Sequence, residues 1–106
     1  MDERENIISK VKEYKKLVDK EFPVKIEQFY LFGSYAKGNP HQDSDIDVAL
    51  IVPHLEEDYD FWETTPLLWH LRWNIDLRIE PHLVARDEDY SDFVKEIERT
   101  GIEITT

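Results

Sequence analysis

The sequence of 106 residues contains no cysteine, only three glycines and a single methionine. Without cysteine the chain has neither a disulfide framework nor a thiolate metal site, which is compatible with the reducing cytoplasm. It also has no apolar run that approaches the length of a membrane-spanning helix, and its charged N-terminus is unlike a secretory signal peptide. We therefore expect a cytoplasmic protein with no membrane partner.

Basic residues are few, because 13 Lys and Arg stand against 24 Asp and Glu, and the net charge is −11. A protein that binds nucleic acid directly presents a basic face to the phosphates, so this charge argues against direct nucleic-acid binding. Bound cations would instead relieve local repulsion. The length and the 41% hydrophobic content predict one domain over residues 1–106, with one core.

Hydrophobic periodicity predicts alternating helices and strands. The expected elements are a helix from Asp2 to just before Pro23, a strand over 24–32, a helical turn over 34–37, a strand over 45–52, a helix over 65–73, a strand over 75–80, a helix over 87–99 and a short edge strand over 102–104. We expect Pro81 to end the third strand and Tyr90 to face the core. The short link between the first two strands allows an antiparallel pair, and the helix between the second and third allows a parallel crossover. The fold class is α/β (α+β), a small mixed sheet flanked by helices in two or three layers.

One stretch, residues 33–52, carries most of the recognisable chemistry. Gly33-Ser34 follows an apolar strand, and residues 34–37 form a short helical turn that Gly38 closes. Free backbone N–H groups at such a helix start suit a phosphate group, and Gly33 lets the backbone come close to it.

The same stretch continues into Asp45-Ile46-Asp47 and the apolar run after it. In a strand, Asp45 and Asp47 share one face, about 7 Å apart at Cα. At an effective dielectric of about 20 their repulsion costs roughly 2 kcal/mol. A hard divalent cation such as Mg²⁺ reverses the sign of this term, since it takes carboxylate oxygens as ligands. Asp76 lies opposite the apolar face of the third predicted strand and is the candidate third carboxylate.

The pattern Gly-Ser-x-x-x-Gly, followed by Ser-Asp-x-Asp, resembles the signature of the nucleotidyltransferase superfamily that includes DNA polymerase beta. The matching residues are Gly33, Ser34, Gly38, Ser44, Asp45 and Asp47. The small size resembles the minimal nucleotidyltransferases of prokaryotes, which are often encoded beside a HEPN-domain partner. The resemblance implies the polymerase beta-like nucleotidyltransferase fold.

The resemblance also implies a reaction and its residues. A nucleoside monophosphate, AMP from ATP, would pass to a hydroxyl acceptor, with two Mg²⁺ ions (or Mn²⁺) as cofactors. Asp45 and Asp47 would hold both ions, and Asp76 would hold the ion that activates the acceptor and could accept its proton. Nucleotide and phosphate binding would fall to Gly33, Ser34, Lys37, Gly38 and Ser44.

The resemblance implies a HEPN toxin as the acceptor, and an antitoxin role. Two alternatives stay open: a non-catalytic antitoxin that neutralises a HEPN ribonuclease by complex formation, and a small-molecule (antibiotic) nucleotidyltransferase. The helix around Trp69 favours a partner surface, because Trp62, Trp69 and Trp73 share one side while leucines spread round the rest. The same aromatic residues could instead belong to the core.

Several candidate residues also have a purely structural interpretation. Asp76 could be a surface acid paired with Arg78 or Arg72, and Lys37 could be merely exposed. The four histidines show no ligand spacing and are interpreted as surface or structural residues: His41, His54, His70 and His82.

Overall fold

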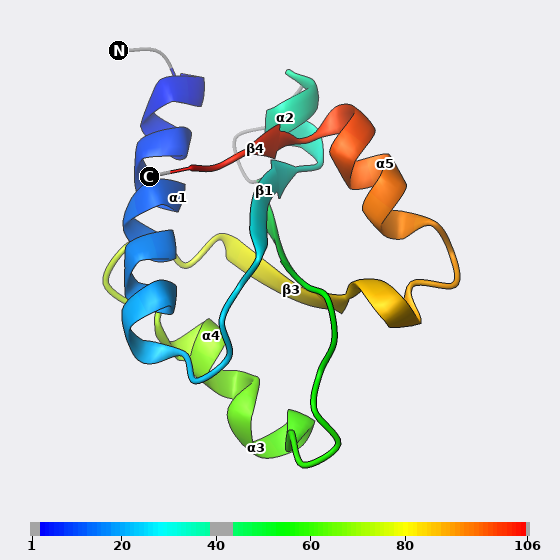
Figure 1. The fold of residues 1–106 in the computed structure, drawn as a ribbon. Helices are drawn as coiled ribbons and strands as arrows, with labels where there is room; N and C mark the ends of the chain where they lie inside the picture. The colour runs from blue at the N-terminus through cyan, green and yellow to red at the C-terminus, as the bar shows by residue number, and fades with distance from the viewer. Residues whose placement is uncertain (1–2, 39–43, 106) are drawn as a thin grey trace.

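The computed structural model describes residues 3–38 and 44–105, and Figure 1 shows their arrangement. The elements are α1 (Glu3–Glu21), β1 (Gln28–Phe32), α2 (Ser34–Lys37), β2 (Ile46–Val52), α3 (Phe61–Thr64), α4 (Pro66–His70), β3 (Ile79–Ala85), the 3₁₀ turn η1 (Arg86–Glu88), α5 (Phe93–Thr100) and β4 (Ile102–Glu103). No helix in these two ranges is long and apolar enough to cross a membrane.

The four strands form one sheet in the order β3-β2-β1-β4. β1 is antiparallel to both β2 and β4, while β2 and β3 are parallel, so the predicted mixed sheet is confirmed. The register places Phe32 of β1 opposite Asp47 of β2, and Asp47 opposite Glu80 of β3. Three neighbouring strands therefore bring their side chains together at this one level of the sheet.

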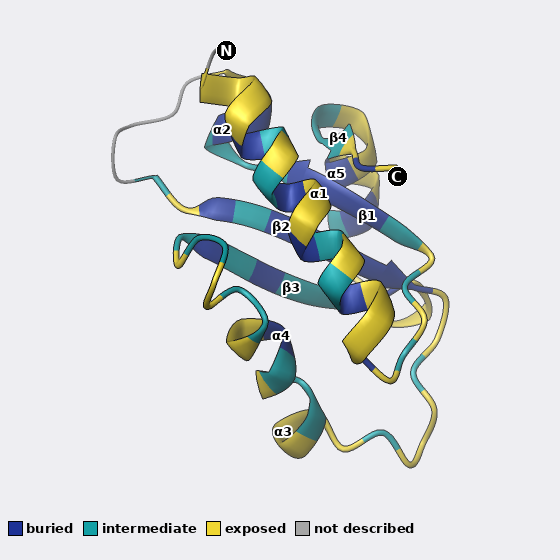
Figure 2. Ribbon diagram, turned by 90° about the vertical axis from the view of Figure 1, so that its left-hand side faces the viewer, coloured by how far each residue is buried: buried dark blue, intermediate teal, exposed yellow. Residues whose placement is uncertain are grey.

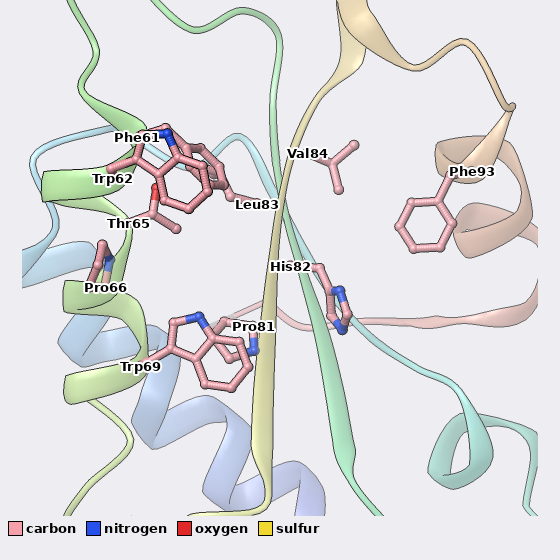
Figure 3. A pocket seen from close by; sticks show the side chains of 10 residues that line it. All are labelled: Phe61, Trp62, Thr65, Pro66, Trp69, Pro81, His82, Leu83, Val84 and Phe93. Carbon is pink, nitrogen blue, oxygen red and sulfur yellow. The ribbon is translucent and has the colours of Figure 1, made fainter.

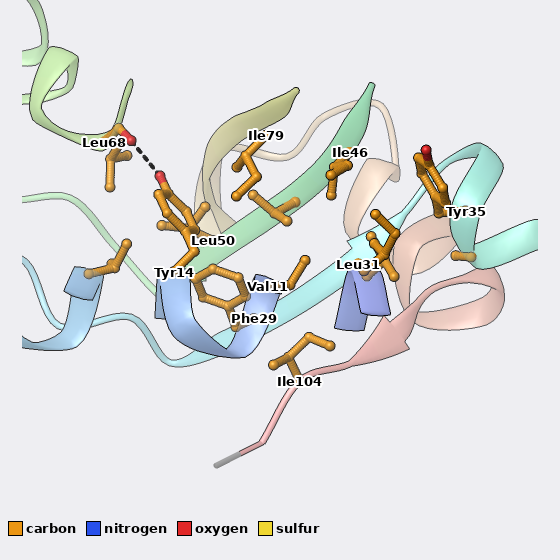
Figure 4. Packing of buried hydrophobic residues seen from close by; sticks show 14 of the residues in the cluster. Val11, Tyr14, Phe29, Leu31, Tyr35, Ile46, Leu50, Leu68, Ile79 and Ile104 are labelled. Carbon is orange, nitrogen blue, oxygen red and sulfur yellow. Dashed lines mark hydrogen bonds between the residues drawn. The ribbon is translucent and has the colours of Figure 1, made fainter. Parts of the chain in front are cut away.

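Helices cover both faces of the sheet. On one face Ile46, Val48 and Leu50 of β2 join the larger apolar cluster. α1 covers this face of the sheet (Figure 2), and Figure 4 shows Ile46 and Leu50 among the packed side chains. On the other face Ala49 and Ile51 pack with residues of α5 in a second cluster. Alternate side chains of β2 thus pack into two cores on opposite faces of the sheet, so the molecule has three layers: α1, the sheet and α5.

The larger core is anchored by Tyr14 of α1. Its ring is fully buried and meets Phe29 of β1 edge to face, with the ring centroids 6.1 Å apart. Its hydroxyl donates a hydrogen bond of 2.6 Å to the carbonyl oxygen of Leu68 in α4 (Figure 4). Because α4 has only five residues and cannot be stable alone, this bond helps to hold it against α1.

The third strand differs from the prediction. Residues 75–78 form turns and irregular backbone, and β3 begins at Ile79 and continues through Pro81 to Ala85. Proline is tolerated because β3 is an edge strand. The N–H of Ile46 donates to the carbonyl of Arg78 at 2.8 Å, so alternation along the strand points the nitrogen of Pro81 away from β2.

Other boundaries also differ from those predicted. The first strand starts at Gln28, the helix expected over 65–73 ends at His70, and the last helix starts only at Phe93. Asp89 accepts hydrogen bonds from the N–H groups of Phe93 and Val94, and this capping competes with an earlier helix start. Tyr90 is 92% exposed, so its predicted inward position is wrong. Asp2 and the turn over 39–43 lie outside the described residues.

Tyr14→Phe is expected to lower the free energy of unfolding by about 1–2 kcal/mol, because it leaves the buried carbonyl of Leu68 without its donor. Urea denaturation followed by circular dichroism measures this loss. The matched control is Tyr90→Phe, which alters an exposed hydroxyl and should change stability by less than about 0.5 kcal/mol. Equal effects from both variants would contradict the anchoring role of Tyr14.

Candidate active site

The two ends of the Gly-Ser/Asp-x-Asp motif meet through the β1–β2 hairpin. Gly33 follows directly on Phe32, which pairs with Asp47. A Cβ added to Gly33 would lie 2.5 Å from Oδ2 of Asp47, so only glycine fits here beside the carboxylate. Gly33 also has φ 77° and ψ −151°, a conformation that residues with a side chain rarely adopt. The predicted phosphate turn thus begins in contact with the predicted metal ligand.

The turn itself is the four-residue helix α2, as predicted. Gly38 closes it in the left-handed conformation at φ 80°, with its N–H bonded to the carbonyl of Ser34. The N–H groups of the first turn have no intrahelical acceptor and are free for an anionic group. Lys37 is exposed, so its side chain is free to reach a bound anion.

Three ligand-type side chains converge beside this turn. Carboxylate oxygens of Asp47 and Glu80 and a ring nitrogen of His82 all lie within 4.8 Å of one another. Nε2 of His82 is 3.4 Å from Oδ1 of Asp47 and 4.0 Å from Oε1 of Glu80. This nitrogen is buried and has no hydrogen-bond partner among the described residues. A buried, unpaired nitrogen beside two carboxylates fits a divalent cation, since imidazole and carboxylate are both metal ligands.

Asp45 completes the acidic group. A hydrogen bond with the Asp45 carboxyl raises the pKa of Glu80, and burial and the charges of Asp45 and Asp47 act in the same direction, while His82 opposes them. Carboxyl groups that interact in this way repel one another when both are ionised. The described structure therefore brings Asp45, Asp47, Glu80 and His82 into one site, with Ser34 at its phosphate side.

The structure places Asp76 in a different environment. It lies in the irregular segment before β3, where its carboxylate accepts from Nζ of Lys10 at 2.9 Å and from Arg78 at 2.8 Å. The hydrogen bonds from Arg78, and then from Lys10, hold the pKa of Asp76 well below its ordinary value although burial opposes the shift. The strand that was predicted to aim Asp76 at the metal is absent there, and the alternative pairing with Arg78 is the one observed.

This ion-paired acid has a structural consequence. Arg78, held by Asp76, donates a hydrogen bond of 2.9 Å from its guanidinium to the hydroxyl of Tyr35 in α2. Lys10 comes from α1, so Asp76 joins α1, the start of β3 and the phosphate turn. Through Arg78, Asp76 thus helps to hold α2 in place.

Glu80 and His82 were missed by the sequence interpretation, although a signal for Glu80 is present. In Ile79-Glu80-Pro81 an acid lies between two buried residues, the same arrangement as in Ile46-Asp47-Val48. Reading the period of two across Pro81 would have put Glu80 and His82 on one face. The sequence analysis missed His82 because the four histidines show no ligand spacing among themselves, whereas its neighbours in the cluster are the acids Glu80 and Asp47.

A family model described as the nucleotidyltransferase domain matches residues 11–104. The chain belongs to this family. Over 98 residues this nucleotidyltransferase is 28% identical to MJ0141 of Methanocaldococcus jannaschii, a candidate protein adenylyltransferase, and the alignment covers 92% of this chain and 98% of that protein. Over 39 residues it is 41% identical to the protein adenylyltransferase MntA of Shewanella oneidensis. This alignment covers 37% of this chain and 28% of MntA.

Solved structures confirm the nucleotidyltransferase fold. A candidate nucleotidyltransferase from Sulfolobus solfataricus matches with a TM-score of 0.63 at 21% identity, over 94% of this chain and 80% of that chain. A chain of a toxin–antitoxin complex with AMP-PNP matches with a TM-score of 0.61 at 23% identity, over 89% and 72% of the two chains. At these identities the comparison establishes the fold and leaves the chemistry to the site residues.

Glu80 and Asp76 should respond oppositely to loss of charge. Glu80→Gln removes the repulsion between Glu80 and the carboxylates of Asp45 and Asp47. At pH 7 we therefore expect unchanged or higher stability of the metal-free protein, and loss of the rise in melting temperature with Mg²⁺ or Mn²⁺.

Asp76→Asn removes an acceptor for Lys10 and Arg78, so it should lower the free energy of unfolding by about 1–3 kcal/mol while keeping the response to the ion. Thermal melts with and without the ion measure both, and the reverse result would return the metal-ligand role to Asp76.

The pH dependence provides an independent check on Asp76. Its pKa in the folded protein is depressed, so its stabilising contribution is present above the ordinary value of 3.8 and is lost as the pH falls toward the folded pKa. The stability difference between wild type and Asp76→Asn should therefore be constant near neutrality and shrink below about pH 4. Urea titrations at several pH values measure this difference. A difference that persists unchanged in strong acid would contradict the ion-paired state.

Proposed function

We propose that this nucleotidyltransferase moves AMP from Mg²⁺-bound ATP to a hydroxyl of a partner protein, and that it acts as the antitoxin of a HEPN toxin in the cytoplasm. The contact of Gly33 with Asp47 carries the proposal, because it places a phosphate-binding turn beside a group of carboxylates. The protein adenylyltransferase names of the two relatives and the toxin–antitoxin neighbour support the protein acceptor and the antitoxin role.

Each residue has a distinct task in this scheme. The amide and hydroxyl of Ser34, with Lys37, bind the β- and γ-phosphates that leave. Asp45, Asp47 and Glu80 would hold the cations, which neutralise the phosphate charge and lower the pKa of the acceptor hydroxyl. We assign to Glu80 the position on the acceptor side that the resemblance implies for Asp76, because Glu80 pairs with Asp47 across the sheet.

The transfer step forms one bond and breaks one. The acceptor oxygen bonds to the α-phosphorus of ATP, and the bond from that phosphorus to the bridging oxygen breaks, so pyrophosphate leaves. The hydroxyl proton passes to a carboxylate, and Glu80 is the carboxylate that we place on the acceptor side. The remaining work of the protein is alignment, which orients the acceptor oxygen in line with the leaving pyrophosphate.

A second function, neutralisation by binding alone, is favoured by the exposure of Trp62, at 86%, and of Trp73, at 68%. Exposed aromatic residues are typical of protein interfaces. The two functions can coexist in one protein, since a complex is also needed for transfer.

The double variant Asp45→Asn, Asp47→Asn separates chemistry from binding. With labelled ATP, Mg²⁺ and the product of the neighbouring gene as acceptor, we expect label transfer by wild type and at least about a thousandfold loss in the variant. Co-expression with the toxin reports neutralisation, and co-purification reports complex formation. Lost neutralisation with a retained complex supports the enzymatic role, whereas retained neutralisation supports binding. No transfer by wild type to any acceptor tested would count against the proposed reaction.

A further inference from the structure

A hollow of the described surface lies beside the site, between α3–α4 and strand β3. It has a volume of about 600 Å³, and Figure 3 shows aromatic residues on one wall and the strand on the other. We call it the β3 groove and define it by Phe61, Trp62 and Trp69 on the helices and Pro81, His82 and Leu83 on the strand. The three helical residues are 47%, 86% and 39% exposed, so the folded core does not account for them.

The strand wall has an open hydrogen-bonding edge. Because the N–H of Ile46 in β2 donates to the carbonyl of Arg78, the backbone N–H and C=O groups of residues 80, 82 and 84 also point toward β2. Those of residues 79, 81, 83 and 85 point outward. The guanidinium of Arg72 closes the first part of this outer edge by donating to the carbonyl of Ile79 at 3.0 Å. Further along, the N–H and carbonyl of Leu83 have no partner among the described residues, so an added strand could pair there.

The groove also leads into the candidate active site. His82 lines the groove and contributes to the cluster with Asp47 and Glu80. In a strand added to β3, alternate side chains would point to opposite faces. One set would enter the apolar space by Trp69, and the other would lie beside Glu80 and His82, where the acceptor hydroxyl is needed.

The charge of the surroundings indicates what kind of strand fits. Residues 56–63, which lead into and form most of α3, contain five acids and no Lys or Arg: Glu56, Glu57, Asp58, Asp60 and Glu63. A second copy of this chain, with its own charge of −11, would meet repulsion here. A basic segment would meet attraction, which speeds association and fixes the orientation.

We propose that the acceptor polypeptide docks as an additional strand on the outer edge of β3, with apolar side chains in the groove, its target hydroxyl on the side of Glu80 and His82, and lysine or arginine flanking it. This inference rests on the proposed function and adds the acceptor's docking mode and sequence class. The hydroxyl oxygen bonds to the α-phosphorus, pyrophosphate leaves, and the proton passes to the Glu80 carboxylate.

The test uses a library of nine-residue peptides with Ser, Thr or Tyr at the centre and all other positions random. The library is incubated with the full chain, Mg²⁺ and ATP that carries an alkyne tag. Peptides that accept the tagged AMP are captured and sequenced. We expect apolar residues enriched on both sides of the hydroxyl residue, Lys or Arg farther out, and proline depleted where the backbone pairs. A labelled set without this alternating pattern, or one rich in acids, overturns the inference and leaves the transfer activity standing.

Matched variants test the groove itself. Trp62→Ser should reduce the labelling rate of the enriched peptides about tenfold, while Tyr90→Ser, which removes an equally exposed aromatic outside the groove, should not. Leu83→Pro removes the outward N–H, and Leu83→Ala removes only the side chain, so the proline variant should label more slowly than the alanine one. Equal rates within both pairs overturn the docking mode.

Two further outcomes are distinguishable. If wild type labels no peptide and Mg²⁺ with ATP does not raise its melting temperature, the proposed function itself fails. If the chain alone sediments as a dimer that Trp62→Ser dissociates, a second copy occupies the groove and the inference is wrong.

Discussion

The register of the β1–β2 hairpin is the constraint on which the site depends. Because Phe32 pairs with Asp47, Gly33 comes into contact with the Asp47 carboxylate and the phosphate turn begins there. A slip of one residue would turn Asp47 toward the α1 core and bring Ile46 or Val48 to the site. The apolar side chains on the α1 face of β2 therefore fix the register, and their packing positions the Asp47 carboxylate.

Local patterns were enough to predict the element order, the mixed sheet and the motif from Gly33 to Asp47. They fail at β3, where the pattern predicts that Pro81 ends the strand, whereas the strand continues to Ala85. Whether proline fits a strand depends on which edge faces solvent, and that is decided by the strand order of the whole sheet. Because the predicted strand stops before Pro81, the pattern also gives no reason to place Glu80 and His82 on one face beside Asp47.

Asp76 and Glu80 show how the environment divides two nearby acids between structure and chemistry. Hydrogen bonds from Arg78 and Lys10 depress the pKa of Asp76, so its charge stabilises the fold. Glu80 lies beside other carboxylates, which raise its pKa, so its charge opposes the fold. Perturbed acids in a recess are typical of active sites, but the carboxylate of Asp76 is already engaged by Arg78 and Lys10.

The position of β3 at the edge of the sheet would let donor and acceptor approach from different sides in the proposed reaction. β2 lies between two strands, so Asp47 is held in a fixed place beside the phosphate turn. β3 is held on one side only, and beyond Arg72 its outer edge and the groove are open to another molecule. His82 stands where these two regions meet. An acceptor that completes the sheet would bring its hydroxyl to Glu80 by backbone pairing alone, so its specificity would lie in the side chains that fill the groove and in its charge.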